Sequence, residues 1–130
     1  FGPGNHGTTF GGNPLSMRAG VETLRIMVED QLLENAAARG AQLRAAFDAQ
    51  LAPLPGVKDI RGQGLMIGIE LDRPCGALLQ RAADAGLMMS VTADSVIRLL
   101  PPLIITADEC DQLVALLVPL VKAFLAEPKA

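Results

Sequence analysis

Aromatic side chains are scarce in this sequence: they make up 3% of the 130 residues, and neither tryptophan nor tyrosine occurs. Proteins that bind single-stranded nucleic acids stack the bases on such side chains. An excess of positive charge is missing as well, since 11 lysines and arginines stand against 14 acidic residues, for a formal net charge of -3. Without an aromatic platform or a basic stripe, the sequence excludes nucleic acid as the expected partner.

Metal ligands and disulfide partners are equally few. Cys75 and Cys110 lie far apart in the sequence and belong to no CxxC pattern, and His6 is the only histidine. A disulfide between the two cysteines stays open, but two small core residues of a cytosolic protein are the favoured interpretation. A single histidine without nearby ligands predicts no metal site.

Long apolar runs are also missing. Arginine, aspartate, proline or glycine interrupts every apolar stretch well before the roughly 20 residues that a membrane span requires. No basic segment followed by an apolar one stands at the N-terminus, so we expect no signal peptide, no membrane contact and a cytoplasmic location. The sequence starts with Phe1 rather than methionine, inside a glycine-rich stretch, and we therefore expect it to be part of a longer protein.

Half of the residues are hydrophobic, which is enough to bury one domain's core. The first thirteen residues are glycine-rich and predict a loop. Asn13 is a good helix N-cap and Pro14 suits the first helical position, so a helix should begin there. Its apolar residues recur at helical spacing and predict one buried face, formed by Met17, Val21, Leu24 and Val28.

A second helix is predicted from about residue 31 to 51, and the prolines and glycine at 53–56 end it. Its expected inner face consists of Leu33, Ala36, Gly40, Leu43 and Phe47. Residues 57–61 form a short strand candidate, and residues 62–64 a tight turn. Residues 65–71 alternate between apolar and other side chains, which predicts an antiparallel neighbour for the first strand.

The rest of the chain predicts a short helix at 76–85, strands at 87–91 and 96–100, and a final helix. That helix starts with a capping box, the hydroxyl of Thr106 and the carboxylate of Glu109. Its expected apolar face consists of Leu113, Leu116, Leu117, Leu120 and Phe124. The sum is an α+β fold: a small antiparallel or mixed sheet with helices on one face.

The opening loop is the first candidate site. Thr8 and Thr9 place hydroxyl groups beside unhindered glycine amides, just before a helix begins. Amides at a helix start attract anions such as phosphate. Two interpretations stay open from the residues alone: half of a phosphate-binding site, or a glycine-rich connector with a well-capped helix.

Arg98 is the second candidate. It lies in an apolar strand, and alternation places it on one face with Val96 and Leu100. A guanidinium stays protonated and forms two parallel hydrogen bonds to a carboxylate. Arg98 therefore either binds the carboxylate of an amino or oxo acid, or forms a structural ion pair with an aspartate or glutamate of the protein.

Four segments resemble the class III pyridoxal-phosphate-dependent aminotransferases, in the family's order and spacing. Residues 6–15 (HGTTFGGNPL) resemble the motif HG(S/T)T(Y/F)GGNPL, and residues 59–68 (DIRGQGLMIG) resemble the segment VxDIRGxGLMxG. Residues 85–88 (AGLM) and 96–103 (VIRLLPPL) are similar to the family's last landmarks. The resemblance extends over essentially the whole chain.

The resemblance implies a type I aminotransferase fold that works as a homodimer. Residues 1–13 would be the cofactor-phosphate loop at the end of the large domain, residues 14–35 a connecting helix, and residues 36–130 the C-terminal small α+β domain. By the same resemblance, Thr9 binds the phosphate of pyridoxal 5'-phosphate, assisted by Thr8. The loop of residues 7–13 would do so in the partner subunit's active site.

The resemblance also assigns Arg98 to the substrate's α-carboxylate. The substrates would be an amino acid that donates its terminal amino group and a 2-oxo acid that accepts it. The lysine that binds the cofactor covalently lies upstream of residue 6 in the family, and Lys58, Lys122 and Lys129 do not match it. No catalytic residue is therefore expected in this chain, and we expect it to be inactive alone. A free-standing α+β module that binds an anion or dimerises is the alternative.

Overall fold

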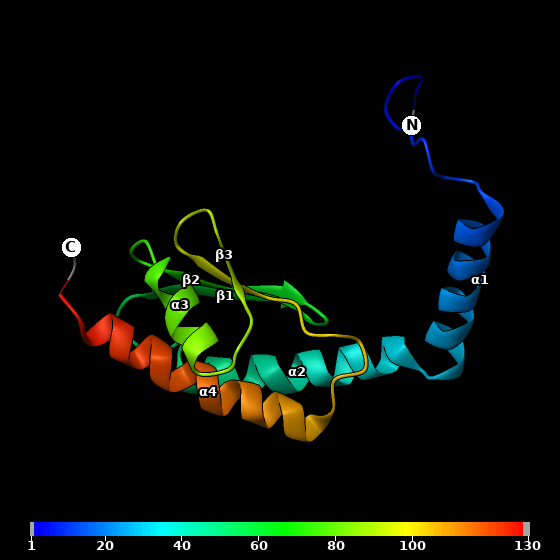
Figure 1. The fold of residues 1–130 in the computed structure, drawn as a ribbon. Coiled ribbons are helices and arrows are strands. Elements are labelled where there is room, and N and C mark those ends of the chain that lie inside the picture. Colours follow the sequence, from blue (N-terminus) through cyan, green and yellow to red (C-terminus); the bar gives the residue numbers. More distant parts are fainter. Residues whose placement is uncertain (1, 129–130) are drawn as a thin grey trace. The chain divides into compact units, whose positions relative to one another are not determined.

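A computed structural model describes residues 2–128 of the chain (Figure 1). The structure divides into two compact units, Phe1–Leu33 and Glu34–Ala130, and each is described by itself. The predicted boundaries of the large and small domains stay a prediction. The elements, in chain order, are α1 (Pro14–Glu29), α2 (Leu32–Gln50), β1 (Val57–Gln63), β2 (Met66–Leu71), α3 (Ala77–Asp84), β3 (Ser90–Thr92), β4 (Val96–Leu99) and α4 (Ala107–Ala126).

Helix α1 begins where the sequence predicts. The Asn13 side chain accepts a hydrogen bond from the backbone N–H of Ser16, and Pro14 opens the first turn. The prediction of a buried face was wrong for this chain. Its four apolar residues are all more than half exposed, because the first unit holds one helix and a loop and no second element to cover it: Met17, Val21, Leu24 and Val28.

Helix α2 packs closely against the turn between β1 and β2. A Cβ atom at Gly40 would lie 2.2 Å from the carbonyl oxygen of Gly64, so only glycine fits there. Leu43 and Phe47 are fully buried, as predicted, but Leu33 is 60% exposed and Leu32 is buried in its place. In the first turn of α2, the buried position is thus one residue earlier than the predicted one.

The sheet has four strands in the order β1-β2-β4-β3, and every pair is antiparallel. Strand β1 continues to Gln63, two residues beyond the predicted end, so the turn comes at residues 64–65 rather than 62–64. The predicted alternation of β2 is confirmed, with Ile67, Ile69 and Leu71 buried. Strand β3 is Ser90–Thr92, so it shares only residues 90 and 91 with the predicted strand 87–91 and continues one residue beyond it.

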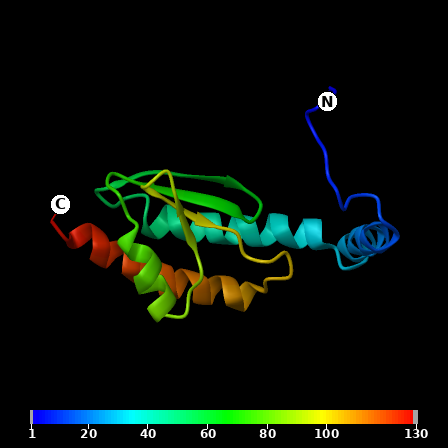
Figure 2. The ribbon, with the colours of Figure 1, turned by 45° about the horizontal axis from the view of Figure 1, so that its top comes forward.

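One hydrophobic core joins the sheet to α2 and α4, which lie along the same face of it (Figures 1 and 2). The sheet contributes the inward-pointing residues of β1, β2 and β4, and α3 contributes Leu78 while packing on α4. The predicted α+β class with helices on one face is therefore confirmed. The open face of the sheet carries polar and charged side chains, among them Arg61 and Arg98.

Helix α4 starts with the predicted capping box between Thr106 and Glu109. Its buried face includes Leu113, Leu117 and Phe124 as predicted, but Leu116 is 38% exposed. The helix turns its other apolar residues inward instead, namely Cys110, Val114, Val118 and Val121. The apolar residues of α4 form more than one stripe at helical spacing. Packing against α2 and the sheet determines which of these stripes is buried.

The capping box makes the stability of this fold depend on acid pH. The backbone N–H and the hydroxyl of Thr106 both donate to Oε2 of Glu109, at 2.8 and 2.9 Å. These bonds lower the pKa of Glu109 from its ordinary value of 4.5. A carboxyl whose pKa is lower when folded stabilises the fold above its unfolded pKa, and the contribution disappears as pH falls through the folded value.

We therefore expect Glu109→Gln to lower the thermal midpoint at neutral pH, and the difference from the original chain to vanish well below pH 4.5. Thermal unfolding of both chains, followed by circular dichroism across this range, measures the effect. A difference that stays constant at all pH values would contradict the assignment to the Glu109 charge.

The turn between β3 and β4 stores backbone strain. Ala93 and Asp94 have φ angles of 47° and 59°, in the left-handed region that disfavours residues with a Cβ atom. Ala93→Gly should raise the free energy of unfolding by about 0.5–1 kcal/mol, because relief of strain exceeds the added entropy of the unfolded chain. Chemical denaturation measures this change. Ala83→Gly, at an exposed position of α3, is the control and should lower stability by about 1 kcal/mol.

Candidate functional site

Arg98 lies on the open face of the sheet, in β4 between β2 and β3. Its neighbours in the strand, Ile97 and Leu99, point into the core and are 0% and 2% exposed. Strand alternation therefore turns Arg98 away from the helices, and its side chain is exposed. The register places Gly68 of β2 on one side of it and Ser90 of β3 on the other.

The guanidinium of Arg98 has no carboxylate partner within residues 2–128. Its Nε donates to the hydroxyl of Ser90 at 3.1 Å, and none of the hydrogen bonds in the described chain uses its two Nη atoms. Arg61, on the same sheet face, differs: its Nη1 lies 2.8 Å from Asp59 and 2.7 Å from Glu70. The structural ion pair considered for Arg98 is therefore not formed in the described residues, and two donors remain for an external acid.

Two shallow hollows meet at Arg98. One, of about 330 Å³, includes Gly68, Thr92 and Val96 beside the two arginines. Gly68 has no side chain, so the sheet surface beside Arg98 is open. A Cβ atom at Gly68 would lie in contact with Val96, at 3.4 Å, and would fill part of this space. The other hollow lies against Met88, Met89 and Leu100. Polar and apolar surface thus flank the free guanidinium, as binding of a small organic acid requires.

The loop before α1 holds Thr8 and Thr9 in different roles. The Thr8 hydroxyl accepts a hydrogen bond from the N–H of Gly11 at 3.1 Å, which closes a turn. A Cβ atom at Gly11 would lie 2.2 Å from the Thr8 methyl carbon, so the turn requires glycine. None of the hydrogen bonds within residues 2–128 uses the Thr9 hydroxyl. The Thr9 hydroxyl is thus unused in the described chain, whereas the Thr8 hydroxyl is engaged within the loop.

The start of α1 offers fewer amides than the sequence pattern implies. Pro14 has no N–H group, the N–H of Ser16 donates to the Asn13 side chain, and the N–H of Met17 donates to the Asn13 carbonyl. The amides of Ser16 and Met17 are therefore engaged within the chain. Thr9 and Arg98 belong to different compact units.

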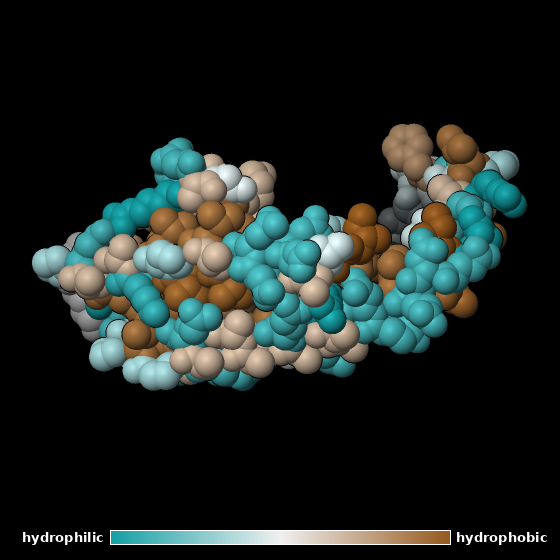
Figure 3. All heavy atoms as spheres, turned by 90° about the horizontal axis from the view of Figure 1, so that it is seen from below, coloured by the Kyte–Doolittle hydropathy of each residue, from teal (hydrophilic) through white to brown (hydrophobic). Residues whose placement is uncertain are grey.

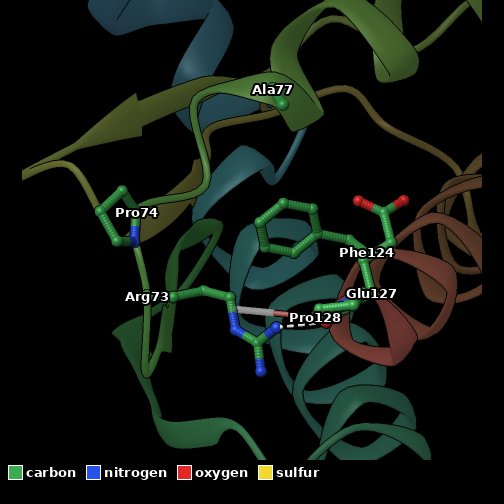
Figure 4. Close-up of a pocket in the computed structure, with 6 residues that line it drawn as sticks. All are labelled: Arg73, Pro74, Ala77, Phe124, Glu127 and Pro128. Atoms are coloured by element: carbon green, nitrogen blue, oxygen red, sulfur yellow. Dashed lines mark hydrogen bonds between the residues drawn. The ribbon is translucent and has the colours of Figure 1, made fainter. Parts of the chain in front are cut away.

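A third hollow, of about 280 Å³, lies at the end of α4 (Figure 4). There Arg73 donates to the backbone carbonyl of Glu127 at 2.8 Å, and Arg81 forms two bonds to the Glu127 carboxylate while lying 5.7 Å from the Phe124 ring centre. Arg81 lowers the pKa of Glu127. The charges around this hollow are thus paired, and they anchor the last helical turn.

The described residues contain no cluster of side chains that suits a metal ion. Cys75 and Cys110 are buried and free, and burial raises the pKa of both thiols, which opposes reactivity. No helix within residues 2–128 is long and apolar enough to cross a membrane. Lys58 and Lys122 lie exposed in β1 and α4, and Lys129 lies outside the described residues.

Sequence reasoning missed Ser90 as the partner of Arg98. The signal lay in the hairpin: with three residues between β3 and β4, pairing Thr92 with Val96 places Ser90 opposite Arg98. The predicted linker of four residues, 92–95, obscured this register.

Comparison with known proteins relates the whole chain to one family. The model of the family "Aminotransferase class-III" matches residues 1–121. Acetylornithine aminotransferase 1 of Bordetella bronchiseptica is 54% identical over 98% of this chain and 32% of its own length. Acetylornithine aminotransferase of Bacillus subtilis is 46% identical over 88% of this chain and 30% of its own length.

Solved structures that are similar to this chain are aminotransferases as well. Ornithine delta-aminotransferase of Plasmodium falciparum superposes with a TM-score of 0.87 at 33% identity, over 98% of this chain and 33% of that one. Acetylornithine aminotransferase of Elizabethkingia anophelis gives 0.80 at 29% identity, over 95% and 34%. The open-faced sheet and its motifs are thus those of an aminotransferase. The chain belongs to the class III aminotransferase family, and it spans about a third of the length of the relatives that it matches.

Proposed function

We propose that this chain is the C-terminal part of a pyridoxal-phosphate-dependent aminotransferase. Its reaction would transfer the terminal amino group of N2-acetylornithine to 2-oxoglutarate, in arginine biosynthesis in the cytoplasm. Within the family, the overall pattern is most similar to acetylornithine aminotransferases, and the relative at 54% identity has that name. The observation that carries the proposal is Arg98, an arginine with two free Nη donors on an open sheet face.

Arg98 would bind the α-carboxylate of each amino or oxo acid in turn. Its positive charge and its two parallel N–H groups match a carboxylate. The amino acid and the 2-oxo acid both carry an α-carboxylate, so the same interaction can bind either substrate. Holding the carboxylate orients each acid: this group is attached to the reacting carbon of 2-oxoglutarate, and it lies at the other end of the chain from the reacting carbon of N2-acetylornithine. The hollow beside Gly68 leaves room for the chain of the acid.

The residues of the loop fit one end of the cofactor. Thr9 offers an unused hydroxyl and Thr8 closes the turn beside it, which suits a phosphate group. Pyridoxal phosphate supplies the electron sink for amino transfer when it is bound. The lysine and the residues that hold the ring would come from the part of the protein before residue 1, so this chain alone should not transaminate.

The loop of residues 7–13 would reach the partner subunit's site in a homodimer. The exposed apolar side chains of α1 support this arrangement, since an exposed apolar patch is typical of an interaction surface (Figure 3). Another ω-amino acid is the second candidate donor. The candidates are ornithine, succinylornithine and 4-aminobutyrate, and the structural similarity to ornithine aminotransferases favours ornithine among them.

The test is an absorbance titration with pyridoxal phosphate of the full-length protein and of this chain, followed by each candidate donor and 2-oxoglutarate. The full-length protein should develop a visible band that acetylornithine changes more efficiently than the other donors, and this chain should develop none. If the chain binds the cofactor tightly alone and no longer protein exists, it is a free-standing binding module and the proposal fails.

Thr9→Val in the full-length enzyme should weaken pyridoxal phosphate binding about tenfold or more, because one hydrogen bond to a charged phosphate is lost. Equilibrium dialysis of the cofactor measures this. Thr8→Val is the matched control, since its hydroxyl closes the turn with Gly11, and its effect should be smaller. Unchanged affinity in Thr9→Val would remove Thr9 from the phosphate site.

A further inference from the structure

The Ser90 hydroxyl makes two hydrogen bonds to one residue. Its oxygen accepts from Nε of Arg98 at 3.1 Å, and its proton is directed to the backbone carbonyl of Arg98 at 3.4 Å. The two residues are direct partners in the β3–β4 ladder. A hydroxyl has one proton and two lone pairs, so a single orientation of Ser90 satisfies both bonds.

We propose that Ser90 is a positioning residue that fixes the Arg98 guanidinium so that a carboxylate binds end-on, to Nη1 and Nη2. This inference rests on the proposed role of Arg98 and deepens it. A guanidinium offers a carboxylate two edges, one with both Nη atoms and one that includes Nε. Because Ser90 occupies Nε, only the end-on edge remains for the acid.

Among residues 2–128, the bond to Ser90 is the hydrogen bond that the Arg98 side chain forms. Arg61, the other charged residue that lines the same hollow, is itself held by Asp59 and Glu70. Met88 and Leu100, which line the other hollow, have no polar side-chain atom that could hold Nε. An arginine side chain loses much rotamer freedom on binding, and a prior bond to Ser90 removes part of that cost before the substrate arrives.

Steady-state kinetics of Ser90→Ala in the full-length enzyme test the inference. The KM values of the amino donor and of 2-oxoglutarate should each rise about fivefold, while kcat and cofactor affinity change less than about twofold. Ser90→Thr keeps the hydroxyl and should restore KM. Ser95→Ala is the control, because its hydroxyl bonds to the Ala93 carbonyl in the same hairpin and makes no bond to Arg98.

Arg98→Ala separates this inference from the function on which it rests. If Arg98→Ala leaves KM unchanged, the carboxylate role of Arg98 is wrong. If Arg98→Ala raises KM and Ser90→Ala does not, only the role of Ser90 is wrong. In the Arg98→Ala background, Ser90→Ala should add nothing; a further rise there, or no rescue by threonine, would also overturn it.

Discussion

Arg98→Ala in the full-length aminotransferase should lower kcat/KM for amino donor and 2-oxo acid about 100-fold or more. Removing one partner of a hydrogen-bonded charge pair costs about 2–5 kcal/mol, and each 1.4 kcal/mol is about a factor of ten. The loss should appear mainly in KM, because the carboxylate is bound before and during the reaction. Initial rates with both substrates, alongside a cofactor titration, measure this effect.

Arg61→Ala provides the matched control for Arg98. Arg61 lies on the same open sheet face, but Asp59 and Glu70 already bind its Nη1. These bonds raise its pKa, and the two carboxylates together outweigh its single positive charge, so a further acid is repelled there. Its replacement should change KM less than about threefold. Equal loss of cofactor affinity and substrate binding in Arg98→Ala would contradict the assignment.

Gly40→Ala should destabilise the fold by about 2 kcal/mol. The new Cβ atom would lie 2.2 Å from the carbonyl oxygen of Gly64 and 2.5 Å from its carbonyl carbon, so α2 or the β1–β2 turn must shift. Overpacking against backbone costs about 3 kcal/mol, and the better helix propensity of alanine returns about 1 kcal/mol. The thermal midpoint should fall by about 10 °C.

Gly76→Ala is the control for this steric effect. Gly76 precedes α3 with φ -54° and ψ -31°, and no atom lies within 4 Å of the position of a Cβ atom. Alanine adopts this conformation freely, so the free energy of unfolding should change by less than about 1 kcal/mol. A Gly40→Ala chain as stable as the original would show that α2 does not pack against Gly64 in solution.

Local signals in the sequence predicted the elements that have strong end markers. Asn13 with Pro14 and Thr106 with Glu109 set the starts of two helices, and both caps form as expected. Alternation in β2 predicted which face is buried, because a strand has a period of two. The prediction for α1 failed, since a helical stripe such as Met17 and Val21 indicates burial against some element without saying which chain segment supplies it.

The sequence by itself determined the α+β class, the family motifs and the residue types of the candidate site. Only the tertiary structure decided what Arg98 contacts: the order β1-β2-β4-β3 places it between Gly68 and Ser90, while Asp59 and Glu70 pair with Arg61. Hydrogen-bond partners across a sheet depend on strand order and register. These are set by packing of the whole core on α2 and α4, and spacing along the chain does not contain them.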